Sequence, residues 1–193
     1  MQKSGMSDML IEFNGYKPKI AKGAWIASGA KVIGEVEIGE DSSIWFNCVL
    51  RGDINSIRIG KRTNIQDLST LHVWPRGVLD KKDIGSNTLD LGYPVDIGDD
   101  VTIGHNCVIH ACKIHSRCLI GMQTCIMDGA EISQDSIIGA GSVITKGKKF
   151  PPCSLILGNP AKFIRELRND EILFIRESAQ NYVRYKNSFM QPN

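Results

Sequence analysis

The chain has 193 residues, 42% of them hydrophobic, and a formal net charge of +2, which is typical of one globular domain. Such a small excess of charge does not favour binding to nucleic acid or to a membrane surface. No stretch approaches the roughly 20 apolar residues of a membrane-spanning helix, and the first residues lack the apolar core of a signal peptide. We therefore expect a single domain over residues 1–193 that works in the cytoplasm, with its six cysteines reduced.

Aliphatic residues recur every six positions between residues 18 and 146, where we expect the main body of the domain. The series comprises Ile20, Ile26, Val32, Ile38, Ile44, Leu50, Ile59, Ile65, Leu71, Ile97, Ile103, Ile109, Ile114, Ile120, Ile126, Ile132, Ile138 and Ile144. A period of six is neither the 3.6 of an amphipathic helix nor the two of an exposed strand, and it indicates the hexapeptide repeat of a parallel β-helix. Three hexapeptides would close one triangular coil, and successive coils would stack at about 4.8 Å around an aliphatic core.

Two other positions of the repeat support this all-β interpretation. Glycine often follows the aliphatic residue, as at Gly39, Gly60 and Gly98, where we expect corners with backbone conformations that side chains resist. Four places after the aliphatic residue small residues dominate, as at Ser42 and Cys107. Both patterns are typical of a tight coil, and the resemblance to hexapeptide-repeat proteins implies that the coil is left-handed, an exception to the usual right-handed crossover.

The repeat loses its phase at three places. Three extra residues separate Leu50 from Ile59 and one residue is missing between Ile109 and Ile114, so at each we expect a local bulge or a tightened corner. Residues 73–96 contain two prolines, three glycines and no six-residue period. They indicate a loop inserted at a corner, and loops of that length in a compact domain are often functional.

The pattern ends after residue 146 in a breaker-rich connection over residues 147–168. Residues 169–189 are predicted to form a C-terminal α-helix, which Asn169 or Asp170 can cap. Its apolar positions are Ile172, Ile175, Ala179, Tyr182 and Val183. We expect the helix to pack against the outside of the coils, where it protects open strands.

Two histidines occupy the same position of the repeat, because His72 follows Leu71 and His110 follows Ile109. If the loop over residues 73–96 occupies no face of the coil, three hexapeptides, or one complete coil, separate the two histidines. Their backbones would then lie about 4.8 Å apart on one face. Two imidazoles placed in this way can share one metal ion, with zinc–nitrogen bonds of about 2.0 to 2.1 Å.

The third histidine, His105, follows Ile103 by two places and lies one face earlier, up to roughly 16 Å from His110 along the chain. We therefore do not expect it to reach the same metal within one subunit. Three prisms packed about a threefold axis would bring His105 of one chain to the His72 and His110 of the next, which predicts a homotrimer with interface sites. Three histidines also match a catalytic zinc site, whose fourth position is left to water. His115 has no partner in this scheme, and we expect it to be structural or solvent-facing.

Three stretches of the sequence resemble the gamma-class carbonic anhydrase family. They are WFNCVLRGDINSIRIGKRTNIQDLSTLH from Trp45 to His72, IGHNCVIH from Ile103 to His110, and GNPAKFIREL from Gly158 to Leu167. The resemblance implies that His72 and His110 bind metal from one subunit and His105 from its neighbour. It implies Zn²⁺ as the cofactor, with Fe²⁺ or Co²⁺ as alternatives. Tyr182 matches a tyrosine of the family that can approach the metal.

Other site residues are implied by the same resemblance. Asn64 and Gln66 match positions that contact the bound water or bicarbonate. Arg51, Asp53 and Asp67 match an ion-pair and hydrogen-bond set at the subunit interface. For Arg51 and Asp53 a purely structural ion pair is the alternative interpretation.

The implied reaction is the attack of metal-activated hydroxide on carbon dioxide to give bicarbonate, which would make the protein a lyase. The proton that is released must still reach buffer through a titratable group near the mouth of the site. The best-characterised members have glutamates that this chain lacks, one of them where Ile54 stands here. Asp80, Asp83, Asp90 or Asp96 could take their place.

Two alternatives stay open. A coenzyme A-dependent hexapeptide acyltransferase has the same fold, but such enzymes typically use a single histidine as general base and need no metal. A catalytically weak, metal-braced trimeric scaffold is the second alternative, and the missing glutamates favour it.

Overall fold

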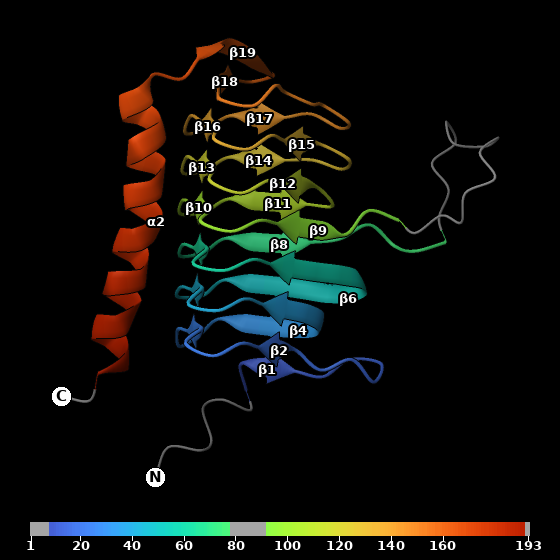
Figure 1. The fold of residues 1–193 in the computed structure, drawn as a ribbon. Coiled ribbons are helices and arrows are strands. Elements are labelled where there is room, and N and C mark those ends of the chain that lie inside the picture. The colour runs from blue at the N-terminus through green and yellow to red at the C-terminus, as the bar shows by residue number, and fades with distance from the viewer. Residues whose placement is uncertain (1–7, 78–91, 192–193) are drawn as a thin grey trace.

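The computed structural model describes residues 8–77 and 92–191, and it shows a column of stacked coils with one long helix beside it (Figure 1). The strands are β1 (Leu10–Ile11), β2 (Lys19–Ile20), β3 (Trp25–Ile26), β4 (Lys31–Ile38), β5 (Ser43–Ile44), β6 (Val49–Ile59), β7 (Asn64–Ile65), β8 (Thr70–His72), β9 (Val95–Ile97), β10 (Thr102–Ile103), β11 (Val108–His110), β12 (Lys113–Ile114), β13 (Leu119–Ile120), β14 (Cys125–Ile126), β15 (Glu131–Ile132), β16 (Ile137–Ile138), β17 (Val143–Ile144), β18 (Ser154–Gly158) and β19 (Ala161–Glu166). The helix is α2 (Asn169–Met190). Strands stacked along the column pair in parallel, whereas β18 and β19 form an antiparallel pair at its end. The parallel β-helix is the fold that the six-residue period predicted, and the helical spacing of apolar residues after residue 169 predicted the C-terminal helix.

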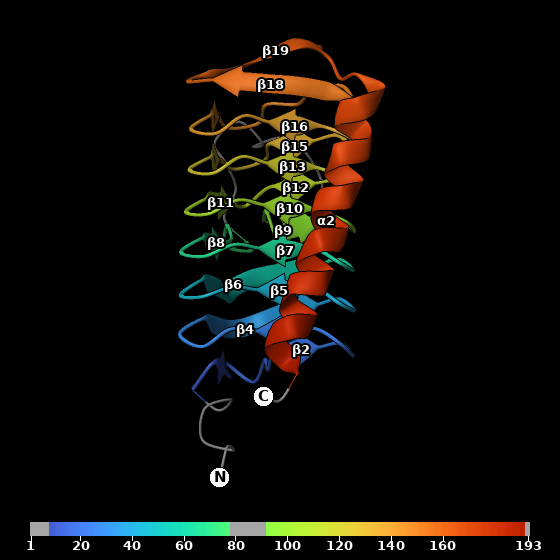
Figure 2. The ribbon, with the colours of Figure 1, turned by 90° about the vertical axis from the view of Figure 1, so that its left-hand side faces the viewer.

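The column has three faces, which the strand pairings define. The helix face consists of β3, β5, β7, β10, β13, β16 and β18, and α2 runs along it (Figure 2). The histidine face consists of β8, β11, β14 and β17, together with the first halves of β4 and β6. The charged face consists of β2, β9, β12 and β15, together with the second halves of β4 and β6. Because β4 and β6 run through the corner between them, the last two faces form one 11-stranded sheet.

The inward side chains of the three faces form one continuous core. From Val32 to Ile144, every aliphatic residue of the predicted series is at most 4% exposed. Ile20 and Ile26, in the first coil, are partly buried against this core. The small residues four places after each aliphatic, such as Ser42, are buried as well. The period therefore identified the inward positions correctly.

The six cysteines are all free thiols. Burial raises the pKa of Cys48 and of Cys118 to about 12 and that of Cys107 to about 11, so these thiols stay protonated. They pack as small core residues, in agreement with their place in the repeat.

Replacing Ile114, which is 1% exposed, by alanine should lower the free energy of unfolding by about 2–5 kcal/mol, because the substitution leaves a cavity in the core. Its neighbour Lys113 is exposed on the outer surface, so Lys113→Ala should change that free energy by less than about 0.5 kcal/mol. Urea unfolding followed by circular dichroism measures both values. Equal effects of the two substitutions would contradict the assignment of inward and outward positions.

The glycines that follow the aliphatic residues permit close approach between coils, which differs from the reason we expected. Gly39 and Gly60 do not adopt a left-handed φ. A Cβ on Gly60 would lie 2.6 Å from the carbonyl carbon of Gly98 in the next coil, so no side chain fits there. The left-handed backbone falls two places later, at Asp41 and Arg62, with φ of 58° and 52°.

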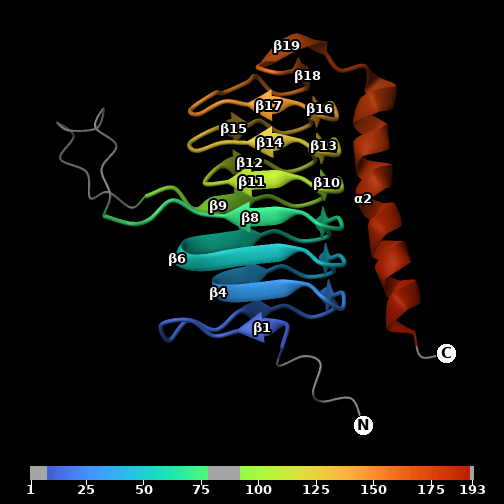
Figure 3. The same ribbon diagram turned by 180° about the vertical axis from the view of Figure 1, so that it is seen from behind.

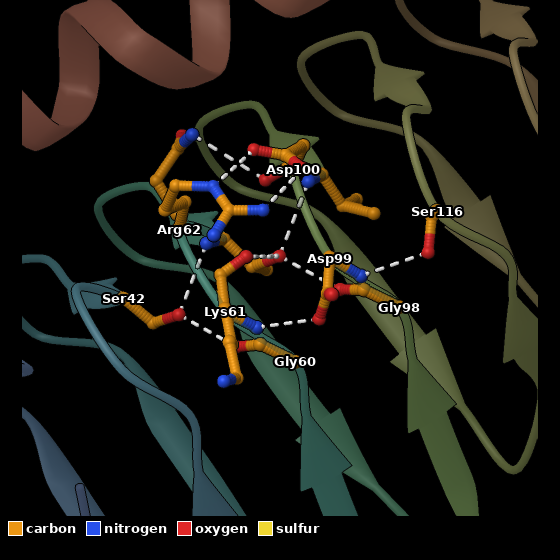
Figure 4. A network of polar contacts seen from close by, with 11 residues as sticks. Ser42, Gly60, Lys61, Arg62, Gly98, Asp99, Asp100 and Ser116 are labelled. Atoms are coloured by element: carbon orange, nitrogen blue, oxygen red, sulfur yellow. Dashed lines mark hydrogen bonds and ion pairs between the residues drawn. The ribbon is translucent and has the colours of Figure 1, made fainter.

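A ladder of ion pairs follows the corner between the charged face and the helix face. Arg62 donates from Nε and Nη2 to the two carboxylate oxygens of Asp100, at 2.7 Å each (Figure 4). In the coils that follow, Arg117 donates to Asp135 in the same way, at 2.7 and 2.8 Å. Bidentate pairs of this kind fix the relative orientation of the two side chains. The ladder therefore joins neighbouring coils where their backbone is left-handed.

All three breaks in the phase of the repeat fall at the corner between the histidine face and the charged face. In β6, residues 53–56 oppose the single residue Glu35 of β4, which confirms a bulge at this position. After Ile109 the corner is tightened, and Ala111 takes a left-handed φ of 48°. The inserted loop is shorter than the predicted 73–96, because Val73 is buried and Val95–Ile97 form β9. Residues 78–91 of this loop lie outside the described residues.

Residues 147–168, predicted as a connection, contain the antiparallel pair of β18 and β19 (Figure 1). β18 extends the helix face, where Leu155 is in register with Ile137 of β16, and β19 folds back along β18. Ser154 and Ile156 of β18 are fully buried. The six-residue period does not extend to this pair, because β19 reverses direction and does not start a new coil.

The helix α2 lies where it was predicted and ends one residue later, at Met190. Neither Asn169 nor Asp170 is its cap. That position belongs to Arg168, whose backbone N–H donates to Oε2 of Glu171 at 2.8 Å. Among the described residues, no helix is long and apolar enough to cross a membrane.

Candidate metal centre

His72 and His110 end two neighbouring strands of the histidine face, β8 and β11. The two residues are register partners, which confirms that they are stacked one coil apart. Nδ1 of His72 lies 3.2 Å from Nε2 of His110. Their side chains are 17% and 31% exposed, so the pair is partly sheltered from solvent.

The bulge in β6 brings an acidic residue to the first of these histidines. Oδ1 of Asp53 lies 3.1 Å from Nε2 of His72, and Nη1 of Arg51 donates to Oδ2 of Asp53 at 2.5 Å. Burial alone would raise the pKa of the Asp53 carboxyl, but the hydrogen bonds from Arg51 and His72 outweigh it and hold that pKa below its usual range. The Arg51 and Asp53 pair therefore touches the site directly.

Asp128 makes the corresponding contact with the second histidine. It follows β14 in the next coil, and its Oδ1 is in short contact with Nδ1 of His110. Sequence reasoning did not single out Asp128. The signal that could have found it is an acidic residue at the same corner, one coil beyond His110.

His105 lies just after β10, at the opposite edge of the histidine face from His72 and His110. Its Nδ1 is 2.8 Å from Oδ2 of Asp67, and the side chain is 47% exposed. Among the described residues of this chain, no group of three histidine, cysteine, aspartate or glutamate side chains could hold a metal ion. One chain therefore brings two of the predicted ligands together and holds the third apart from them.

A cavity of about 320 Å³ lies beside His105, between the corner of the column that carries this histidine and the second half of α2. Trp45, Tyr182 and Phe189 are among the residues that line it. Tyr182 packs edge-on against Trp45, with ring centroids 5.4 Å apart. Burial, followed by the charge of Asp67, raises the pKa of the Tyr182 phenol, which therefore keeps its proton. The helix thus contributes a wall of the site as well as covering a face.

The predicted amide residues lie on the helix face, on the same side of the column as His105. Nε2 of Gln66 donates to Oδ1 of Asn64 at 3.2 Å, and Nδ2 of Asn64 donates to Oγ1 of Thr102 at 3.0 Å. Thr102 in turn is 3.1 Å from Oγ of Ser178 on α2. Both amides are almost fully buried, so this chain of hydrogen bonds fixes their orientation.

The outward residues of the three faces differ in chemistry. On the charged face the residues in register are Lys19, Glu37, Arg58, Asp96, Lys113 and Glu131, whose charges alternate in sign. On the histidine face they are Lys31, Val49, Thr70, Val108, Cys125 and Val143, so this series is uncharged from Val49 onwards. The helix α2 covers the helix face and leaves the histidine face open (Figure 3). Val108 is 46% exposed, so an apolar surface separates His105 from the histidine pair.

Two further sequence predictions fall on the charged face. Nε2 of His115 is 2.8 Å from Oε1 of Glu131, and this partly exposed histidine lies away from the other three. Asp96, a candidate proton carrier, is in register with Lys113 on the same face. The other candidates, Asp80, Asp83 and Asp90, lie outside the described residues.

Known proteins are similar to this chain in sequence and in fold. The family model for the bacterial transferase hexapeptide (six repeats) matches residues 17–52 and 111–146, and the model for the hexapeptide repeat of succinyl-transferase matches residues 84–111. Gamma carbonic anhydrase 2, mitochondrial, of Arabidopsis thaliana is 41% identical over 166 residues, which are 86% of this chain and 56% of that protein. The carbonic anhydrase of Geobacillus kaustophilus is 42% identical over 175 residues, which are 91% of this chain and 87% of that protein. The chain belongs to the gamma carbonic anhydrase-like family.

Solved structures related to this gamma carbonic anhydrase-like chain include proteins named as transferases. A hexapeptide transferase family protein of Anaplasma phagocytophilum has a TM-score of 0.83 at 36% identity, covering 94% of this chain and 98% of that one. This chain spans 56% of the length of the Arabidopsis relative. Because relatives of this chain carry both names, the fold alone does not decide the reaction, and the histidines must decide it.

Proposed function

We propose that the protein is a carbonic anhydrase of the gamma class, a lyase that interconverts carbon dioxide and bicarbonate at a metal ion. The observation that carries this proposal is the pair of ring nitrogens, Nδ1 of His72 and Nε2 of His110, 3.2 Å apart. The names of relatives such as the carbonic anhydrase of Geobacillus kaustophilus support it. We further infer that the enzyme uses Zn²⁺, with Fe²⁺ or Co²⁺ as alternatives, because imidazole is a suitable ligand for such metals. We also propose that it works in the cytoplasm.

The donor set fits a divalent metal. Two nitrogens bound to one tetrahedral ion at about 2.0 to 2.1 Å lie about 3.3 Å from each other. The 3.2 Å between the two histidines is close to that separation. Burial lowers the pKa of His72, although Asp53 opposes the shift, so the imidazole is neutral near pH 7. A histidine must be neutral to bind metal, so its environment supports this role.

A homotrimer would supply the third ligand. The apolar histidine face carries His72 and His110 at one edge and His105 at the other, so the two halves of the site flank the open surface. A second copy packed on this face about a threefold axis would bring His105 of the partner subunit to the pair. Each interface would then offer three imidazoles and leave one position of the metal open.

A divalent metal held here would lower the pKa of a water to about 7 and so supply hydroxide, the nucleophile for carbon dioxide, near neutral pH. Gln66 would orient the reacting oxygen or the product bicarbonate through its amide, which Asn64 holds in place. Tyr182 keeps its proton, so its hydroxyl remains a hydrogen-bond donor at the cavity beside His105. The aromatic walls of that cavity suit an apolar gas.

The alternative of an acyltransferase is favoured by the transferase name of the Anaplasma phagocytophilum structure. A single general base would not require a second imidazole within 3.2 Å, so the pair favours a metal site. Purified protein assayed with acetyl coenzyme A and common amine or hydroxyl acceptors tests this alternative. Turnover of the thioester with no bound metal would contradict the carbonic anhydrase proposal.

Carbon dioxide hydration by the zinc-loaded protein is expected to rise at least about tenfold when a small imidazole buffer is added, because an external base replaces a missing proton carrier. The physical reason is the absence of any glutamate between His72 and Asp96, where the best-characterised members of the family carry one. Stopped-flow measurement of the initial rate against buffer concentration gives the effect, with metal-free protein as the baseline for buffer catalysis. A fast rate that does not depend on buffer would show that the chain has its own carrier, and no hydration at any buffer concentration would favour the scaffold alternative.

A further inference from the structure

Each of the three histidines of the candidate centre holds one ring nitrogen against a carboxylate. Nε2 of His72 faces Asp53 at 3.1 Å, and Nδ1 of His105 faces Asp67 at 2.8 Å. The third contact, between Nδ1 of His110 and Oδ1 of Asp128, is short. Every one of these carboxylates lies in a different hexapeptide from its histidine, so the stacking of the coils creates the pairs.

The carboxylates determine which nitrogens of the histidine pair carry lone pairs. A neutral imidazole has a single ring proton, and a carboxylate next to one nitrogen draws the proton to that side. The opposite nitrogens, Nδ1 of His72 and Nε2 of His110, are then both acceptors, and they face each other at 3.2 Å. Two lone pairs at this distance repel unless a cation lies between them, so the arrangement is prepared for a metal ion.

We propose that Asp128 is the positioning residue of His110, and that it holds the imidazole in the tautomer whose Nε2 can bind the metal. This inference rests on the proposed metal site. The matching carboxylate for His72 is also bonded to Arg51, so substituting Asp53 would disturb two contacts at once. Asp128 offers the cleaner test, because its one other hydrogen bond among the described residues runs from the N–H of Gly147 to its backbone carbonyl, which a substitution leaves in place.

The test compares Asp128→Ala and Asp128→Asn with the unsubstituted protein. Zinc affinity, measured by competition with a chelator, should fall roughly 10- to 100-fold in Asp128→Ala, as is typical when a histidine ligand loses its carboxylate partner. The zinc affinity of Asp128→Asn should fall less, because the amide oxygen of the asparagine can still accept a hydrogen bond from the N–H of His110. The second measurement is the ring ¹⁵N spectrum of the metal-free protein. It should show His110 protonated on Nδ1 in the unsubstituted protein and a mixture of tautomers in Asp128→Ala, which a purely structural role would not cause.

Glu131→Gln is the matched control, since it changes a carboxylate beside His115 on the charged face and should leave zinc affinity unchanged. Unchanged affinity and an unchanged tautomer in Asp128→Ala would overturn the inference. His110→Ala separates this failure from a failure of the proposed function. If His110→Ala keeps its zinc, the proposed metal site itself is wrong. If His110→Ala loses its zinc and Asp128→Ala keeps it, only the proposed role of Asp128 is rejected. If Asp128→Ala does not fold, Asp128→Asn carries both measurements.

Discussion

His110→Ala should reduce bound zinc from about one ion per subunit to almost none and slow carbon dioxide hydration by roughly 1000-fold or more, because two imidazoles no longer meet a catalytic site's need for three protein ligands. The remaining pair of His72 and Asp53 is already joined by a hydrogen bond at 3.1 Å and offers one ring nitrogen to the ion. Metal analysis after exhaustive dialysis gives the stoichiometry, and stopped-flow hydration gives the rate. His72→Ala should behave in the same way, since the two histidines are equivalent by register.

The fold should survive this substitution. The side chain of His110 is 31% exposed at the end of β11, and the core residue beside it, Ile109, is unchanged. Circular dichroism should therefore match that of the unsubstituted protein. His115→Ala is the matched control, because this histidine also pairs with a carboxylate but lies on the charged face. It should keep both zinc and activity, and retention of a full complement of zinc by His110→Ala would reject the metal site proposed here.

The six-residue period predicted the core because burial in a β-helix repeats with the coil. Every inward residue meets its equivalents above and below, so the identity of one position constrains its neighbours in the next coil. The same argument placed His72 opposite His110, since both follow an inward aliphatic and one coil separates them. Positions defined by the period were thus predictable from sequence alone.

Features outside the period were not predictable in this way. Asp128 lies two places after an inward aliphatic, where spacing does not show whether the side chain leans towards the site. Lys186 lies on the same stripe of α2 as Ile175 and Ala179 and is 1% exposed, although a lysine is rarely buried without a partner; its Nζ donates to Asp41 at 3.1 Å. The antiparallel pair of β18 and β19 shares no period with the coils. Each of these depends on tertiary contacts that a repeat does not encode.

The site lies where the repeat is least regular. The bulge of β6 carries Asp53, the tightened turn follows His110, and the inserted loop follows His72, all at one corner of the column. The three breaks of phase thus lie beside His72 and His110, although Asp67 and Asp128 approach their histidines from hexapeptides of regular length. The breaks of phase that weaken the pattern are therefore the better guide to the chemistry, whereas the unbroken repeat is the guide to the fold.

Hybrid trimers of His105→Ala and His110→Ala subunits should regain metal that neither parent binds. Each proposed site joins one subunit's His105 edge to the His72 and His110 edge of the next, so a mixed trimer of either composition has one interface with both edges intact. Co-expression with two different affinity tags, followed by tandem purification, isolates mixed trimers. They should contain about one metal ion per trimer, against about three in the unsubstituted protein and almost none in either parent.

The matched control for this experiment is a mixture of His72→Ala and His110→Ala subunits. Both of these changes lie on the same edge of the histidine face, so every interface of every trimer lacks one ligand and no metal should return. Recovery in the first mixture and not in the second would show that His105 acts across the interface. If mixed trimers of the first kind form and bind no metal, the third ligand does not come from His105 of the partner subunit. In that case the apolar histidine face would join subunits without completing a metal centre.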